Sequence, residues 1–316
     1  KKDNILNIKN YKIIMNNVND FIKNNYTHRN PGVRSKLKNM LKFGKLANTG
    51  KLVIFPVDQG FEHGPGRSFS KNTLGYDPLY HVEFAIEGGC NAYAAPLGFI
   101  ETAANEYPGD IPLILKINNN NSLYSTKNPL SSMTSSIQDA LELGCHGVGF
   151  TIYPGTSMTN ENFWQLKEAI RDAHDVGLAA IVWSYARGEN IAKENETALD
   201  VIAYGTHIAA QMGADIIKVK PPTKNIGLEV SKSSYENIPK DTLTDRIQHI
   251  MASAFNGKRI TIFSGGVSKS IDDVIEDVKS IKNGGGHGSI MGRNLFQRNK
   301  DDAMHLLNKV IDIYKN

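Results

Sequence analysis

The sequence predicts an α/β protein whose main domain is a (β/α)8 TIM barrel with an N-terminal helical extension. Short β-branched runs recur along the 316 residues, and longer helical segments separate them. Several of these helical segments end at a glycine that precedes the next apolar run, which is the rhythm of a parallel sheet. Eight such units match one closed barrel, which takes roughly 250 residues.

Two other architectures also fit the length of the chain. Two smaller domains are one alternative, but the only low-complexity stretch is the polar segment INNNNSLYS at 117–125. A doubly wound open sheet usually shows a G-x-G-x-x-G turn after its first strand, and DQGFEHGPG at 58–66 lacks that spacing. We therefore divide the chain into a helical extension over 1–47, which caps the bottom of the barrel, and a single barrel domain over 48–316.

The predicted strands are apolar runs that end in polar or small residues. They cover 51–60, 91–98, 111–118, 146–154, 178–188, 214–222, 258–266 and 288–294. Amphipathic segments precede them, such as 161–177 before the fifth run and 270–285 before the eighth, and 301–315 forms the final helix. The glycines that end the helices before runs four to seven are Gly144, Gly177, Gly213 and Gly257.

Composition limits the classes of partner. The formal net charge of +4 favours anionic small molecules but is too small to indicate nucleic acid. Cys90 and Cys145 form neither a disulfide framework nor a metal-spaced cluster, so we expect buried free thiols in a reducing compartment. No apolar run has the length of a membrane span, and the first thirty residues lack a secretory signal. These features predict a cytoplasmic protein without a membrane partner.

In such a barrel, chemistry is expected at the carboxyl ends of the strands. The charged side chains at those ends are mostly basic. They include Asp58, Lys116, Asn118, Tyr153, Trp183, Tyr185, Arg187, Lys218, Lys220, Ser264 and Arg293. A basic mouth with a single acid suits a phosphorylated substrate.

The last two strands end in FSGG at 263–266 and MGRN at 291–294. Barrels often bind phosphate between these two loops, where small residues leave backbone N–H groups accessible. The alternative is a pair of tight turns that need glycine for backbone reasons. The position of the pair beside an arginine favours phosphate. The expected cradle consists of Ser264, Gly265, Gly266, Gly292 and Arg293.

Two lysines end the sixth run, ADIIKVKPP at 214–222. Lys218 and Lys220 are two residues apart, so they share one face of the strand. A lysine with a lowered pKa can attack a carbonyl as a neutral amine and form a Schiff base. Burial and repulsion by Lys220 both lower the pKa of Lys218. Equally, one or both lysines could bind phosphate or extend to solvent.

Further roles follow from side-chain chemistry. Tyr185 could move a proton beside an iminium or simply line the barrel, and Trp183 is expected to pack. Asp58 could orient a lysine or accept a substrate proton, although a turn residue is the alternative. His63 has no second histidine at ligand spacing, so we expect no catalytic metal and no other cofactor.

Six motifs occur in an order typical of one family: FPVDQGFEHGPGRSF, PLILKIN, IVWSYARG, GADIIKVK, FSGG and MGRN. From about residue 30 to near the C-terminus, the chain resembles the archaeal-type class I fructose-bisphosphate aldolases in their longer bacterial form. The resemblance implies a barrel that forms a Schiff base, needs no metal and assembles into homo-oligomers, often decamers of stacked pentamers. It also implies reversible cleavage of fructose 1,6-bisphosphate in glycolysis and gluconeogenesis.

The resemblance assigns a role to each matching residue. Lys218, rather than Lys220, is the Schiff-base lysine, and Tyr185 is the proton donor and acceptor. Trp183 lines the site, and Asp58 is the acid of the VDQG turn. The residues implied to contact the substrate or its phosphates are Lys116, Arg187, Ser264, Gly265, Gly292 and Arg293. An additional acid of the family, after the Schiff-base strand, has only Glu229 as a weak counterpart.

Two rival functions remain open. A sibling Schiff-base enzyme on the same scaffold, such as an aminodeoxyheptulosonate synthase or a thiolase for a phosphorylated autoinducer, shares the lysine, the tyrosine and the cradle. The long extension and the VDQGFEHGPG form of the first motif favour the aldolase. A non-catalytic phospho-sugar binding protein is the other rival, but it has no need for Lys218 and Tyr185 together.

Overall fold

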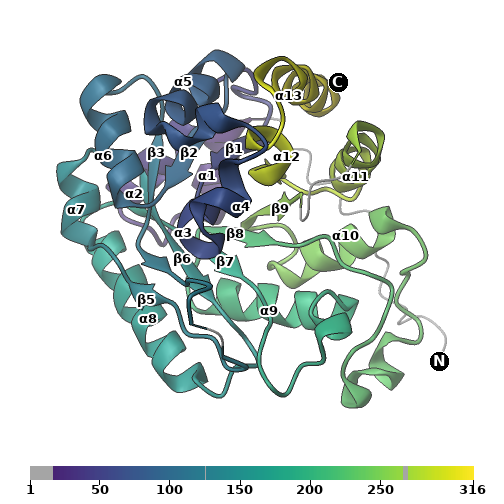
Figure 1. The fold of residues 1–316 in the computed structure, drawn as a ribbon. Coiled ribbons are helices and arrows are strands. Elements are labelled where there is room, and N and C mark those ends of the chain that lie inside the picture. Colours follow the sequence, from purple (N-terminus) through teal and green to yellow (C-terminus); the bar gives the residue numbers. More distant parts are fainter. Residues whose placement is uncertain (1–16, 125, 266–269) are drawn as a thin grey trace.

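The computed structural model describes residues 17–124, 126–265 and 270–316. Its centre is a closed barrel of parallel strands in the order β1-β10-β9-β8-β7-β6-β3-β2 (Figure 1). The barrel strands are β1 (Leu52–Pro56), β2 (Ala92–Ala95), β3 (Leu113–Lys116), β6 (Gly147–Ile152), β7 (Ala179–Ser184), β8 (Ile216–Val219), β9 (Ile260–Ser264) and β10 (Gly288–Ile290). The predicted (β/α)8 barrel is confirmed.

Each strand is shorter than the run that predicted it. β8 ends at Val219, so Lys220 lies just beyond the sheet. β7 ends at Ser184, so Tyr185 and Arg187 begin the following loop. The polar ends of the runs therefore form the mouth loops and not the barrel wall.

Helices surround the barrel (Figure 1). The helices after β1 are α3 (Gln59–His63), α4 (Pro65–Phe69), α5 (Pro78–Gly88), α6 (Leu97–Glu106), α7 (Ile137–Glu142), α8 (Thr159–Asp175), α9 (Leu199–Gln211), α10 (Leu243–Ser253), α11 (Ile271–Asn283), α12 (Arg293–Phe296) and α13 (Lys300–Lys315). Short 3-10 turns are η2 (Thr73–Tyr76), η3 (Lys193–Asn195), η4 (Glu229–Ser231) and η5 (Ser233–Tyr235).

Local sequence signals explain where these helices begin and end. Thr242 and Asp245 form a reciprocal capping box at the start of α10, which satisfies backbone donors that the first turn leaves free. Gly177 follows the end of α8 with a φ of 81°, a conformation that only glycine adopts without strain. The helix–glycine–strand pattern of the sequence therefore has a direct backbone cause.

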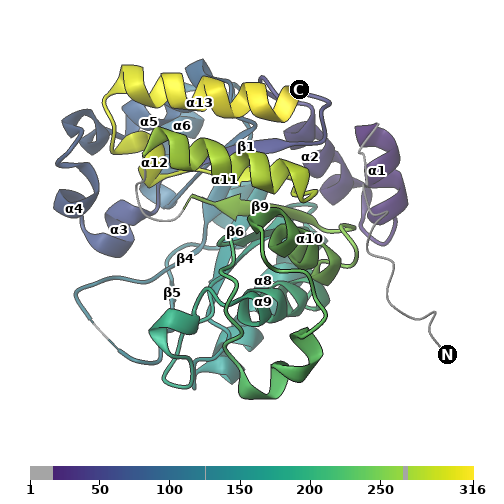
Figure 2. The same cartoon turned by 90° about the vertical axis from the view of Figure 1, so that its right-hand side faces the viewer.

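Two N-terminal helices, α1 (Val18–Asn25) and α2 (Pro31–Leu41), close one end of the barrel, opposite α3 and α4 (Figure 2). Their apolar faces belong to the same buried cluster as the barrel interior. The buried residues that they contribute are Val18, Phe21, Ile22, Val33, Leu37, Met40 and Leu41. The expected helical cap at the bottom of the barrel is present, and the division of the chain at residue 48 stays a prediction.

Polar contacts fix the segment that holds α1 and α2, the helical plug, to the barrel. The Tyr26 hydroxyl donates to the backbone oxygen of Asp215 at 2.7 Å, and Ile260 N–H donates to the same hydroxyl at 3.1 Å. Arg29 Nε donates to Asp215 Oδ1 at 2.6 Å, and His174 Nε2 lies 2.8 Å from Oδ2. Asp215 is fully buried, so these partners satisfy a charge that would otherwise be costly.

The opposite end carries the loops that follow the strands. The polar stretch after β3 forms a small antiparallel pair, β4 (Asn118–Asn119) with β5 (Ser132–Met133), beside this end (Figure 2). Cys90 and Cys145 are free and buried, as expected. Within the described ranges, no helix combines the length and apolar character needed to cross a bilayer.

Candidate active site

Lys218 lies on β8 with its side chain in the barrel interior, and the residue is only 2% exposed. Trp183 on β7 is its register partner. The Lys218 Nζ lies 5.0 Å from the centre of the Trp183 ring and 5.5 Å from that of Tyr185. Lys218 therefore faces two aromatic rings instead of extending to solvent.

Burial lowers the pKa of Lys218 to about 8, and the Arg293 guanidinium acts in the same direction. The Asp58 and Glu62 carboxylates oppose this shift because they favour the ammonium form. An amine with that pKa is about one-tenth neutral at pH 7, roughly 200-fold more than an ordinary lysine. Tuning of this pKa by Lys220 stays a prediction.

Lys116 ends β3 and is 1% exposed. Its Nζ donates to the backbone and side-chain oxygens of Asn118. Asn118 is held in turn by Thr151, whose N–H donates to Asn118 Oδ1 at 2.7 Å. The Lys116 Nζ also lies 5.7 Å from the centre of the Trp183 ring, so Lys116 and Lys218 contact the same indole.

Two carboxylates follow β1. Asp58 is 4% exposed, and its Oδ1 finds no hydrogen-bond partner among the described residues. Glu62 lies one helical turn later, in α3. Its backbone N–H donates to the backbone oxygen of Asp58 at 3.1 Å. Burial, followed by the Asp58 charge, raises the pKa of Glu62 to about 7, while Lys116 and Lys218 oppose the shift. Glu62 therefore exchanges a proton near neutral pH.

Tyr185 and Arg187 extend from the end of β7. Tyr185 N–H donates to the Ile152 oxygen at 3.0 Å, which continues the sheet contact past the last strand residue. Burial, with the Asp58 and Glu62 charges next, raises the pKa of Tyr185, so its phenol keeps its proton. The Arg187 Cζ lies 5.7 Å from the ring centre of Tyr185 and equally far from that of Tyr153.

A third carboxylate, Glu196, lies in the loop after β7. Its Oε2 lies 3.9 Å from Arg187 Nε and 3.8 Å from Lys220 Nζ. The structure thus corrects the expectation of a mouth with a single acid, because Glu62 and Glu196 reach it from segments beyond the strand ends. Glu229, in contrast, pairs with Lys232, and its side chain is 84% exposed.

The expected cradle residues come together at the ends of β9 and β10. The Asn294 side chain donates to the Gly265 oxygen at 3.1 Å, which joins the two loops. A Cβ at Gly265 would lie 2.5 Å from the Asn294 amide nitrogen, so a larger residue there would displace the side chain that joins the two loops. Arg293 begins α12 directly after Gly292, and Gly266 lies outside the described residues.

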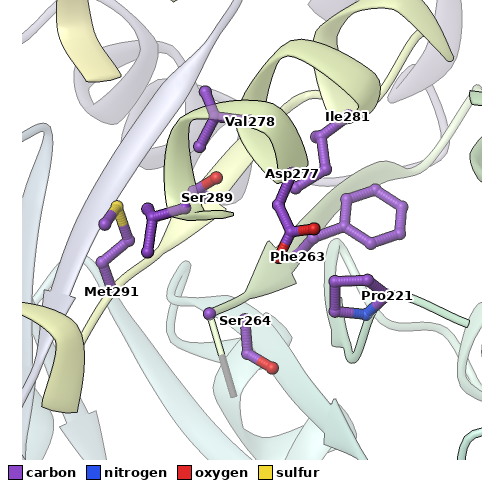
Figure 3. A pocket seen from close by; sticks show the side chains of 10 residues that line it. Pro221, Phe263, Ser264, Asp277, Val278, Ile281, Ser289 and Met291 are labelled. Carbon is purple, nitrogen blue, oxygen red and sulfur yellow. The ribbon is translucent and has the colours of Figure 1, made fainter. Parts of the chain in front are cut away.

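A small pocket lies between β9, β10 and α11 (Figure 3). Ser264 and Gly265 line it together with Pro221, which follows Lys220, and with residues of α11 such as Asp277. The pocket therefore lies next to the expected cradle, since Ser264 and Gly265 belong to both.

Within residues 17–124, 126–265 and 270–316, no group of three or more His, Cys, Asp and Glu side chains could hold a metal ion. The absence of a catalytic metal stays a prediction. Sequence reasoning missed Glu62 and Glu196 because it considered only strand ends. The spacing of Glu62, four residues after Asp58 in a helical segment, was a usable signal.

Comparison with known proteins connects this site to a family. The model of the DeoC/LacD family aldolases matches residues 52–298. A Chlamydia trachomatis serovar D protein named "Probable fructose-bisphosphate aldolase class 1" is 36% identical over 298 residues, covering 90% of this chain and 85% of its own. The fructose-bisphosphate aldolase class 1 of Thermoproteus tenax is 34% identical over 253 residues, covering 80% of this chain and 86% of its own.

Solved structures give the same relationship. A crystal structure of an archaeal fructose 1,6-bisphosphate aldolase matches with a TM-score of 0.74 and 31% identity, over 89% of this chain and 99% of that one. An archaeal aldolase with its catalytic lysine covalently bound to the carbinolamine intermediate of the substrate has a TM-score of 0.74 and 30% identity, with the same coverage.

A closed barrel with a buried lysine among aromatic rings is typical of enzymes that process carbonyl compounds through an amine. The family match spans most of the barrel. The chain belongs to the DeoC/LacD family of aldolases, in the branch of the class 1 fructose-bisphosphate aldolases. The resemblance seen in the sequence motifs is thus confirmed.

Proposed function

We propose that the protein catalyses reversible aldol cleavage of fructose 1,6-bisphosphate to dihydroxyacetone phosphate and glyceraldehyde 3-phosphate, through a Schiff base on Lys218. The observation that carries this proposal is the buried Lys218 amine, whose pKa burial lowers to about 8. The class 1 fructose-bisphosphate aldolase relatives and the solved lysine-bound intermediate support the same reaction.

In the first stage, the neutral Lys218 Nζ attacks the C2 carbonyl carbon and forms a carbinolamine. The carbinolamine oxygen leaves as water once it is protonated, and an iminium remains. We assign this proton to the Asp58–Glu62 pair, because the pKa of Glu62 is about 7 and both charges act on Lys218. A carboxyl that titrates near neutral pH suits a general acid.

In the second stage, the C3–C4 bond breaks and its electron pair moves into the iminium, giving an enamine. The C4 hydroxyl proton passes to the Tyr185 oxygen. Because burial raises the pKa of Tyr185, its phenol already carries a proton. Tyr185 must therefore release that proton to another group as it accepts the proton of the C4 hydroxyl. The Asp58 and Glu62 carboxylates, whose charges act on Tyr185, are the acceptors we assign.

The substrate's two phosphates need separate cationic sites. We assign the phosphate of the ketone half to the cradle of Ser264, Gly265, Gly266, Gly292 and Arg293. For the other phosphate, Arg187 is a better candidate than Lys116. The Arg187 side chain is 37% exposed, whereas Lys116 is almost fully buried and bonded to Asn118. Trp183 lines the site between these groups.

The decisive test is borohydride reduction in the presence of fructose 1,6-bisphosphate, followed by peptide mass mapping, with and without a chelator. We expect one adduct, on Lys218, with and without the chelator, and none in Lys218→Ala. Lys224→Ala is the matched control, since Lys224 is an exposed lysine in the loop that follows β8. Normal trapping in Lys218→Ala, or loss of activity with chelator, contradicts the proposal.

A substrate panel separates the two rivals. Faster turnover of another phosphorylated carbonyl compound favours a sibling Schiff-base enzyme, and failure to trap any ketose phosphate favours a non-catalytic binder. The Asp58 Oδ1 and Trp183 Nε1 atoms, buried without partners among the described residues, support a polar ligand that enters the barrel.

We also propose that the protein acts in the cytoplasm as a homo-oligomer, with a decamer as the expected size. Trp164 on α8 and Tyr204 on α9 are 57% and 61% exposed, which suits burial between subunits. Light scattering after size-exclusion chromatography measures the mass directly. A monomer at micromolar concentration contradicts the oligomer.

A further inference from the structure

Glu196 lies between two cations at the rim of the mouth. Its Oε2 is 3.9 Å from Arg187 Nε and 3.8 Å from Lys220 Nζ. Both distances exceed the length of a hydrogen bond, so the carboxylate balances the cations without a close bond to either one. The three side chains are 24% to 37% exposed, so solvent and solutes reach them.

The two cations lie beside the ring of Tyr185, at 5.7 Å for Arg187 Cζ and 5.6 Å for Lys220 Nζ from the ring centre. Burial, and next the Arg187 charge, lowers the pKa of Lys220, while Glu196 opposes the shift. Two positive charges therefore share one negative charge, and the cluster keeps an excess of positive charge next to the tyrosine assigned to the carbon–carbon bond.

Such a cluster fits a phosphate dianion better than it fits a carboxylate. A phosphate monoester carries about −1.5 to −2 at pH 7 and offers three strong acceptor oxygens. It can neutralise both cations and bond to each, which one carboxylate at 3.8 Å and 3.9 Å does not. Glu196 follows the short 3-10 turn η3 and is partly exposed, so its side chain can turn toward solvent.

We propose that Glu196 is a resident counter-ion that the second phosphate of the substrate displaces, and that Lys220 and Glu196 set the preference for a bisphosphate over a monophosphate. This inference rests on the proposed function and deepens it. Lys220 acts as an anion-binding residue, and Glu196 weakens the site by competing for the same cations.

The test compares steady-state kinetics on fructose 1,6-bisphosphate and on fructose 1-phosphate, which lacks the second phosphate. In Lys220→Gln, we expect the KM for the bisphosphate to rise about tenfold, as for loss of a charge-assisted hydrogen bond. Its KM for the monophosphate should stay within about twofold, because Lys220 has no partner on that substrate. An effect on kcat through the pKa of Lys218 would be the same on both substrates. Lys224→Gln is the matched control from the same loop.

The Glu196→Gln variant has the opposite expected effect. Removing the competing charge should lower the KM for the bisphosphate about three- to tenfold and leave the monophosphate unchanged. Glu194→Gln, two residues away and exposed, is the control. An equal rise in KM on both substrates in Lys220→Gln, or a higher bisphosphate KM in Glu196→Gln, overturns the proposal.

Calorimetry with inorganic phosphate tests the cluster without turnover. Glu196→Gln should bind phosphate more tightly than Glu194→Gln does, and Lys220→Gln more weakly than Lys224→Gln. If the unaltered protein gives no borohydride adduct but these shifts appear, the catalytic proposal fails and the anion site stands. If the adduct forms and the shifts are absent, the anion site fails alone.

Discussion

Gly149 on β6 leaves the space that the Trp183 indole occupies. A Cβ at Gly149 would lie 2.3 Å from Trp183 Cζ3 and 3.3 Å from Lys116 Cδ. The indole in turn contacts the amines of Lys218 and Lys116, so one missing methyl group positions three side chains of the mouth. Gly149 is therefore a glycine because a larger residue would clash with side chains of the site, and not because its backbone conformation requires one.

Gly149→Ala should displace the indole and lower kcat/KM by about 10²-fold, because a shift near 1 Å in a reacting group has that effect. Gly98→Ala on α6 is the control, since a Cβ there meets nothing within 4 Å. Steady-state kinetics and a thermal melt measure both variants. An unchanged kcat/KM in Gly149→Ala contradicts this role for the glycine.

Imine formation should depend on pH through Lys218. Since burial lowers the pKa of Lys218 to about 8, the neutral amine increases as pH rises and levels off above that value. The rate of imine formation, followed by rapid quench with borohydride, should rise with the neutral amine toward about pH 8 and fall again at higher pH, where Glu62, with a pKa of about 7, has lost the proton that it donates. A midpoint near that of an ordinary lysine, about 10.4, would show that the amine is not perturbed.

Glu62→Gln should shift this midpoint downward. The Glu62 carboxylate raises the pKa of Lys218, so removing its charge favours the neutral amine. The same variant loses the proposed acid and should form the iminium more slowly near pH 7, where Glu62 is about half protonated, by roughly 10²-fold. Glu101→Gln, exposed on α6, is the control. An upward shift would contradict the electrostatic relationship between the two residues.

Tyr185→Phe should separate imine formation from bond cleavage. The phenyl ring keeps the packing beside Lys218 but cannot exchange a proton, so turnover should fall about 10²- to 10⁴-fold. Borohydride trapping of the substrate should remain near normal. Turnover close to that of the unaltered protein would remove Tyr185 from the assigned role.

Arg29→Met should destabilise the barrel far from the mouth. Burial tends to raise the pKa of Asp215, yet His174 and Arg29 lower it overall, so the pairing stabilises the fold above the unfolded pKa of about 3.9. Removing one partner of a buried pair costs about 3–5 kcal/mol.

Chemical unfolding at pH 7 measures this loss. The difference should shrink as pH falls below about 4, where Asp215 of the unfolded chain binds a proton, and it should vanish below the lowered pKa of the folded state. Lys23→Met, exposed on α1, is the control for a lost surface charge. Equal stability of Arg29→Met and the control would show that the plug does not depend on this pair.

The sequence predicted the barrel and most of the mouth for one physical reason. In a parallel barrel, all strand ends meet on one side, so a list of strand-end residues is already a spatial list. Lys218, Trp183 and Tyr185 were found in this way, and the structure brings their side chains together. Lys116 was found as well, although its bonds to Asn118 required the coordinates.

The carboxylates were harder to foresee. Glu62 reaches the mouth from a short helix, and Glu196 reaches it from a loop eleven residues after Tyr185. The path of a loop depends on tertiary packing, which no strand pattern encodes. The pKa of Lys218 shows the same limit, because its main cause is burial and the opposing charges come from Asp58 and Glu62.

The two N-terminal helices that close the barrel at the amino ends of its strands restrict how substrate and products can enter and leave. Because α1 and α2 close that end of the barrel, we expect the substrate, the products and the water of hydrolysis in the proposed reaction to pass through the mouth loops at the opposite end. The aldehyde, which is not bound to Lys218, then has to leave by the end through which the water for hydrolysis of the second product enters.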